Sequence, residues 1–222
     1  MESLAQSFFN SPAIDEANGF SPLLRGISAD HSQATDVYTV AALRDLLFAP
    51  LVGGDTDEMD LIAIDIQRER DVGLGTLNET RRALGLFAYS SFAQVTPDPI
   101  LQNDLQMIYG TVGHLDLFIG GLAERPVAGA NVGPTFQAII ARQFQALRDG
   151  DRFFWLNQGF DRQTSSLISN TTLATLIRRN TDTTALQAKV FPAPVIATHG
   201  KPSAPTQQVD THGHRGVPFL IR

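Results

Sequence analysis

One stretch of the chain, residues 60–73, places charged and apolar side chains at a spacing that could support chemistry. At 3.6 residues per turn, Leu61, Ile64, Asp65 and Arg68 fall on a single stripe of a helix. The stripe therefore combines apolar surface with a carboxylate and a guanidinium. Such a face can form an internal ion pair, or it can offer both charges to partners elsewhere.

A second apolar stripe of the same helix carries Ile62 and Ile66. Two apolar stripes predict a helix that is covered on two sides. On such a helix Asp65 and Arg68 would be buried, and a buried charge needs a partner. The residues alone leave two options open: the two side chains pair with each other, or each meets a group on a neighbouring element.

The elements around this stretch are predicted to be short helices joined by long loops that contain glycine. Apolar periodicity, proline and capping residues predict helices at 36–48, 60–73, 103–109, 134–148 and 172–179, and a short helix or turn at 77–86. Residues 19–26 are predicted to be turn-rich, and 116–122 fit either a helix or a buried strand. The fold class is therefore mainly α, with an irregular, loop-rich helical domain at 1–182 and a proline-rich extended tail at 183–222.

Composition excludes several classes of function. The net charge is −6 without a basic cluster, which argues against a nucleic acid or an anionic membrane surface as the main partner. The chain has no cysteine, so disulfides, iron–sulfur clusters and a cysteine nucleophile are excluded. No signal peptide is recognised at residues 1–10, and no apolar run approaches the roughly 18 residues of a membrane span.

The five histidines do not form a metal-binding pattern. They are His31, His114, His199, His212 and His214. Three of them lie in the proline-rich tail, without a carboxylate at a suitable spacing, so solvated side chains are the better prediction there. We therefore predict no metal ligand. No Ser/His/Asp arrangement supports a hydrolase either.

Three segments together resemble one family, the animal-type haem peroxidases, whose superfamily includes cyclooxygenases and fatty-acid dioxygenases. Residues 60–73 resemble the family pattern Asp-Leu, three residues, Asn-Ile-Gln-Arg, one residue, Arg-Asp-His-Gly. Residues 109–124 look like its glycine-rich segment, and 132–154 look like the segment that follows. The resemblance runs from about residue 8 to residue 180 and covers the last part of the family's catalytic domain.

The resemblance implies a role for the stripe at 61–68. The family's asparagine that hydrogen-bonds the iron-bound histidine falls on Asp65, and its propionate-binding arginine falls on Arg68. Leu61 and Ile64 would then line the proximal side of the haem pocket. The distal and proximal histidines of the family precede this segment, so no catalytic residue is assigned to this chain. Asp65 departs from the usual asparagine, and Val72 departs from the usual histidine.

The resemblance thus implies a peroxidase that uses hydrogen peroxide, with haem b shared between this chain and an N-terminal peroxidase half or another peroxidase chain, and with a small molecule as electron donor. Family members are often secreted. Three alternatives stay open. The chain could be an inactive relative that binds or regulates another protein, or a member of the fatty-acid dioxygenase branch, although Tyr38, Tyr89 and Tyr109 match no motif for that role. It could also be a fragment that exposes large apolar patches.

Overall fold

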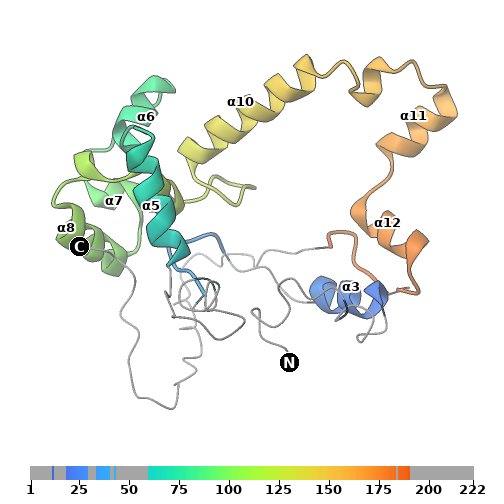
Figure 1. The fold of residues 1–222 in the computed structure, drawn as a ribbon, viewed down its shortest axis with the longest axis horizontal. Helices are drawn as coiled ribbons and strands as arrows, with labels where there is room; N and C mark the ends of the chain where they lie inside the picture. The colour runs from blue at the N-terminus through green and yellow to red at the C-terminus, as the bar shows by residue number, and fades with distance from the viewer. Residues whose placement is uncertain are drawn as a thin grey trace, which may run out of the picture.

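The computed structural model describes residues 12, 19–29, 34–40, 43, 60–183 and 185–190. Within these ranges all regular secondary structure is helical, so the fold is mainly α, as the sequence predicts (Figure 1). The helices are α3 (Phe20–Ala29), α5 (Leu61–Asp71), α6 (Leu77–Ala83), α7 (Phe92–Val95), α8 (Pro99–Tyr109), α9 (Leu117–Ala123), α10 (Pro134–Gly150), α11 (Arg162–Ser169) and α12 (Leu173–Asn180), with the 3-10 turns η1 (Val112–His114) and η2 (Trp155–Asn157).

The helices α5 to α9 form one compact unit, which we call the α5–α9 body (residues 60–124). Its centre is made of leucines with no exposed surface, Leu77, Leu105 and Leu115. Leu77 and Leu115 also share a backbone hydrogen bond of 2.9 Å, which ties the start of α6 to the residues before α9. This apolar core is what fixes α5 in place.

Helix α5 begins and ends where local chemistry dictates. The Asp60 carboxylate accepts hydrogen bonds from the backbone N–H groups of Ile62 (2.9 Å) and Ala63 (3.1 Å), which satisfies two of the free donors of the first turn. Gly73 follows the helix with φ of +73°, a conformation that suits glycine. The helix predicted at 60–73 is therefore confirmed.

Helix α10 is joined to the α5–α9 body by its N-terminal half, where Arg142 donates a hydrogen bond of 3.1 Å to the Leu84 carbonyl, and it then extends away from the body toward α11 (Figure 1). We call residues 134–169 the arm. Beyond the arm, α12 packs with α3 in a second, small apolar cluster around Ala174 and Ile177. An ion pair of 2.6 Å joins Arg25 of α3 to Asp182, two residues after the end of α12.

Several sequence predictions of elements need correction. The segment predicted as turn-rich at 19–26 is helical as part of α3, and residues 36–40 are not helical, while most of the remainder of the helix predicted at 36–48 lies outside the described residues. The helix predicted at 103–109 begins earlier, at Pro99, because Asp98 caps it and proline suits the first turn. Residues 117–123 form a helix, which decides the ambiguity at 116–122. Helices α7 and α11 were not predicted.

Other predictions are confirmed or stay untested. The helices predicted at 134–148 and 172–179 are confirmed as α10 and α12, and the short helix or turn predicted at 77–86 is the helix α6. Residues 191–222 of the predicted tail lie outside the described residues. Leu186 and Val190 pack against α12, and the division at residue 182 stays a prediction. In the described ranges, no helix has the length and apolar character needed to cross a membrane.

Candidate functional site

The predicted stripe of α5 lies together on one side of the helix. Leu61, Ile64 and Asp65 are partly exposed, and the side chain of Arg68 is 74% exposed. The nearest oxygen of Asp65 lies 3.9 Å from the Arg68 guanidinium. A partly exposed pair at this distance contributes at most about 1 kcal/mol to stability. Both charges therefore stay available to other partners.

The predicted burial of α5 on two sides is wrong for Arg68, which is exposed, but Leu61 and Ile64 are half-buried, as Ile62 is. Only the side with Ile62, Ile66 and Glu69 packs into the α5–α9 body. The two apolar stripes point in different directions, and the body reaches only one of them. We call the other side, with Leu61, Ile64, Asp65 and Arg68, the open face of α5.

A buried carboxylate holds α5 against α9. Glu69 accepts a hydrogen bond of 2.9 Å from the backbone N–H of Phe118, and its second oxygen is buried without a hydrogen-bond partner. Burial raises the pKa of Glu69, and the nearby Asp116 raises it further, while the Phe118 N–H and Arg70 act in the opposite direction. Sequence reasoning gave Glu69 no role, because a glutamate inside a helix is usually solvated.

A second contact joins α5 to Asp116, the residue that precedes α9. The Arg70 guanidinium donates to both oxygens of Asp116, at 2.5 and 3.3 Å, and the Tyr109 hydroxyl lies 3.1 Å from the same carboxylate. Burial is the main cause that raises the pKa of the Tyr109 phenol, and the Asp116 charge adds to it. The first and second predicted motifs, at 60–73 and 109–124, thus meet directly.

A buried polar network joins the second predicted motif to the third. The Arg81 guanidinium donates to Glu124 at 2.6 Å, and Glu124 also accepts from the backbone N–H of Thr135 at 2.8 Å. The side chains of Arg81 and Glu124 are 7% and 0% exposed. Arg81 also lies 3.8 Å from the centre of the Tyr89 ring, whose pKa rises to about 12 through burial and the Glu124 charge. We call these four residues the Glu124 network.

Close backbone approach at one glycine reinforces this junction. A side-chain carbon at Gly121 would lie 2.2 Å from the ring of Phe136, so α9 and the start of α10 touch only because glycine is present. The Glu124 network and this contact fix the point from which the arm leaves the body. Sequence reasoning missed the network because Arg81 lies 43 residues from Glu124, and nothing local signals their pairing.

The described residues contain no cluster of three side chains suited to a metal ion. His114 is the one histidine inside the described ranges, and its ring lies 3.3 Å from the carbonyl oxygen of Tyr109. The other four, His31, His199, His212 and His214, lie outside them.

Known proteins are similar to this chain in sequence and in structure. It is 37% identical over 187 residues to peroxinectin A of Dictyostelium discoideum, covering 83% of this chain and 34% of that protein. It is 35% identical to human eosinophil peroxidase, covering 86% of this chain and 27% of that one. Among solved structures, peroxidase A from Dictyostelium discoideum superposes with a TM-score of 0.67 at 37% identity, over 78% of this chain and 33% of that one.

These comparisons agree on the extent of the match. The chain spans between about a quarter and a third of the length of the curated relatives named above. The family model described as animal haem peroxidase matches residues 2–191, which include the α5–α9 body, the arm and α12. The chain belongs to the animal haem peroxidase family.

Proposed function

We propose that this chain forms the proximal wall of the haem pocket in a peroxidase that uses hydrogen peroxide as electron acceptor. The observation that carries the proposal is the open face of α5. Its residues Leu61, Ile64, Asp65 and Arg68 share one side of the helix, while the neighbouring side with Ile62, Ile66 and Glu69 is anchored in the α5–α9 body. Family membership supplies the reaction class.

The residue types on the open face fit haem. Leu61 and Ile64 offer apolar surface to a porphyrin, and the Arg68 guanidinium can donate two parallel hydrogen bonds to a propionate carboxylate. Asp65 would accept the N–H of a histidine, contributed from outside this chain, that holds the haem iron, and would fix the tautomer of that imidazole. When bound, haem supplies the redox chemistry that couples peroxide reduction to donor oxidation.

The exposure of Asp65 and Arg68 supports this assignment. Their 3.9 Å separation is too long for a strong ion pair, so each charge can still bind another group. The aspartate in place of the family's asparagine is an anionic acceptor. Because an anionic acceptor would make the iron-binding histidine more electron-rich, we expect Asp65 to lower the reduction potential of the iron when haem is bound.

The proposal requires a partner. By the resemblance, the distal and proximal histidines belong to the part of the domain that precedes this segment, so that N-terminal portion must join this chain to complete the pocket. We therefore expect no robust peroxidase turnover from the isolated chain. A turnover rate close to that of an intact relative would contradict this expectation.

The test is reconstitution with a relative. The chain is co-expressed with the N-terminal portion of peroxinectin A that has no counterpart here, and haemin is added. We expect a Soret band and peroxide-dependent oxidation of a chromogenic donor. Arg68→Gln should weaken haem binding about 10- to 100-fold, while the control Arg82→Gln, at an exposed arginine of α6, should leave it unchanged.

A second variant addresses Asp65 directly. Asp65→Asn restores the family's usual residue and should raise the reduction potential of the bound iron, measured by spectroelectrochemistry. An assembled complex that binds no haem would refute the proposal, and would favour the inactive relative that acts as a binding or regulatory protein.

The fatty-acid dioxygenase branch has less support. That chemistry would use a tyrosine near the haem, and Tyr89 and Tyr109 instead hydrogen-bond to Glu124 and Asp116 within the α5–α9 body. Neither side chain belongs to the open face of α5. The peroxidase therefore remains the function that the described residues support best.

A further inference from the structure

Helix α10 carries an apolar stripe that starts in the core and continues into solvent. Phe136, Ile140, Phe144 and Leu147 are spaced by four, four and three residues and therefore share one face. Phe136 packs against Gly121, but every residue from 140 to 150 is exposed, and Phe144 is 68% exposed. The helix is thus amphipathic, and most of its apolar face is uncovered.

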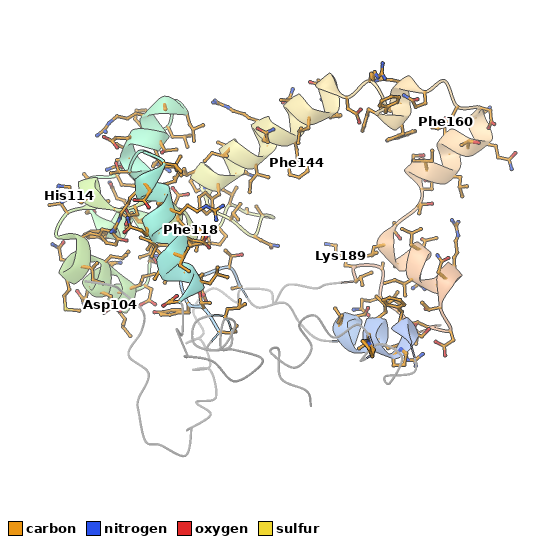
Figure 2. All side chains as sticks on the ribbon, viewed as in Figure 1. Asp104, His114, Phe118, Phe144, Phe160 and Lys189 are labelled. Atoms are coloured by element: carbon orange, nitrogen blue, oxygen red, sulfur yellow. The ribbon has the colours of Figure 1, made fainter. Side chains whose placement is uncertain are left out.

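Further exposed apolar side chains follow beyond α10 along the arm. Figure 2 shows Phe144 on α10 and Phe160 farther along the same arm, before α11. Exposed large apolar side chains occur at intervals between them. We call this set the arm ridge, and its members are Ile140, Phe144, Leu147, Phe153, Leu156 and Phe160.

Such a surface is unusual for a soluble protein that functions alone. Amphipathic helices derive most of their stability from packing of the apolar face, because helix propensity by itself is small. Contiguous apolar patches on a protein surface typically mark an interaction site. The arm ridge therefore needs a cover that the described residues do not provide.

The comparisons indicate what the cover is. The family model matches residues 2–191, so the arm is an integral part of the peroxidase domain rather than an addition to it. The superposition on peroxidase A covers 78% of this chain, far more than the α5–α9 body contains. About two thirds of that protein has no counterpart here.

We propose that the arm ridge is the docking surface for the N-terminal portion of a haem peroxidase domain. The apolar side chains of that portion would cover the ridge, and the Glu124 network sets the direction in which the arm meets it. The identity of the partner rests on the proposed function, whereas the location of the surface rests on the exposure of the ridge.

The test measures where the partner binds. The full chain is mixed with the N-terminal portion of peroxinectin A, and hydrogen exchange of the arm amides is followed with and without it. We expect slower exchange along residues 140–160 in the complex. Phe144→Asp should weaken binding roughly tenfold or more, because a charge would enter an apolar contact.

The matched control is the same substitution, phenylalanine to aspartate, at an exposed position outside the arm ridge. Phe87 is 93% exposed and lies between α6 and α7, off the ridge. Phe87→Asp should change the affinity less than about twofold, within the scatter of surface substitutions. Because both phenylalanines are exposed, neither variant should alter the far-UV circular dichroism of the free chain. Equal effects of the two substitutions on binding would overturn the proposal.

The remaining outcomes are also decisive. If the free chain is a dimer whose ridge amides are already protected, a second copy is the occupant and the proposal is wrong. If no complex forms in trans, a chimera in which this chain replaces its counterpart in peroxinectin A decides the matter. Slow exchange along the ridge in the chimera supports the proposal, and an exposed ridge or an insoluble chimera overturns it.

This test separates the inference from the proposed function. A complex that protects the ridge but binds no haem would leave the docking surface intact and would refute the haem role of α5. A Soret band in a complex whose ridge amides still exchange rapidly would support the haem role of α5 and would refute the docking surface.

Discussion

Removing one charge from the Glu124 network should destabilise the chain strongly. Glu124 accepts hydrogen bonds through both carboxylate oxygens, from Arg81 at 2.6 Å on one and from the Thr135 N–H at 2.8 Å on the other. In Glu124→Gln, one of these positions becomes an NH₂ group that faces a donor. The buried Arg81 charge also loses its counter-charge.

The expected magnitude follows from burial. Breaking a buried ion pair by removing one partner costs about 3–5 kcal/mol, because the remaining charge is left uncompensated. A domain of this size typically has only about 5–15 kcal/mol of stability, so the loss would be a large share of it. The control is Asp149→Asn. Its partner Arg148 lies at a similar distance, 2.8 Å, but both side chains are more than half exposed, so the expected loss is about 0–1 kcal/mol.

The assay is urea unfolding followed by far-UV circular dichroism, with the slope of the transition compared between variants. A double variant, Arg81→Met with Glu124→Leu, should lose less stability than the sum of the two single variants, because no unpaired charge remains. A loss below about 1 kcal/mol for Glu124→Gln, equal to that of Asp149→Asn, would refute the reasoning.

Three further predictions address packing and ionisation. Gly121→Ala should lower the free energy of unfolding by about 1–3 kcal/mol, because the new methyl group would meet the ring of Phe136. Gly26→Ala should raise the free energy of unfolding by up to about 1 kcal/mol, because Gly26 lies inside α3 with open space around it. Urea unfolding measures both changes. Burial raises the pKa of Glu69 in the folded chain, so the wild type should lose stability as pH rises from the unfolded-state pKa of Glu69, near 4.5, to its folded-state pKa. Glu69→Gln lacks this titration and should therefore gain stability relative to the wild type over that range. Unfolding across the range checks this, and a parallel pH dependence of the two proteins would contradict it. All three tyrosines have raised pKa values, that of Tyr89 to about 12, so the folded chain at pH 10 should show much less tyrosinate absorbance than the urea-unfolded chain.

The helices that the sequence predicted correctly carry local signals. Helix α5 has a capping aspartate, and α10 has proline in its first turn together with a long apolar period. Helix α3 was missed because Gly19, Pro22 and Gly26 suggested a turn. Pro22 lies in the first turn of that helix, where its missing N–H has no helical partner to lose. Packing of Leu24 against the α12 cluster helps to offset the cost of Gly26.

The candidate site also has one part that the sequence predicts and one part that it does not. The shared face of Asp65 and Arg68 follows from helical periodicity, so sequence alone could place it. The Glu124 network could not be predicted, because Arg81 and Thr135 are 54 residues apart in sequence and meet only after α6, α9 and α10 have packed. Helical periodicity identifies an apolar face, but it does not tell whether that face packs against this chain or against another one.

Helix α5 and the arm both carry an apolar face that lies outside the core of the α5–α9 body. Helices α5 and α10 both have one part anchored in the α5–α9 body and another part outside its core. Both are also anchored on α9, α5 through Glu69 and Phe118, and α10 through Gly121 and Phe136. Helix α9 therefore sets the position of the open face of α5 relative to the arm ridge. A partner that covers the ridge and completes the haem pocket must match both surfaces at once. Weakening the α9–α10 contact should then impair haem binding without any change in α5, because the partner would dock in the wrong place.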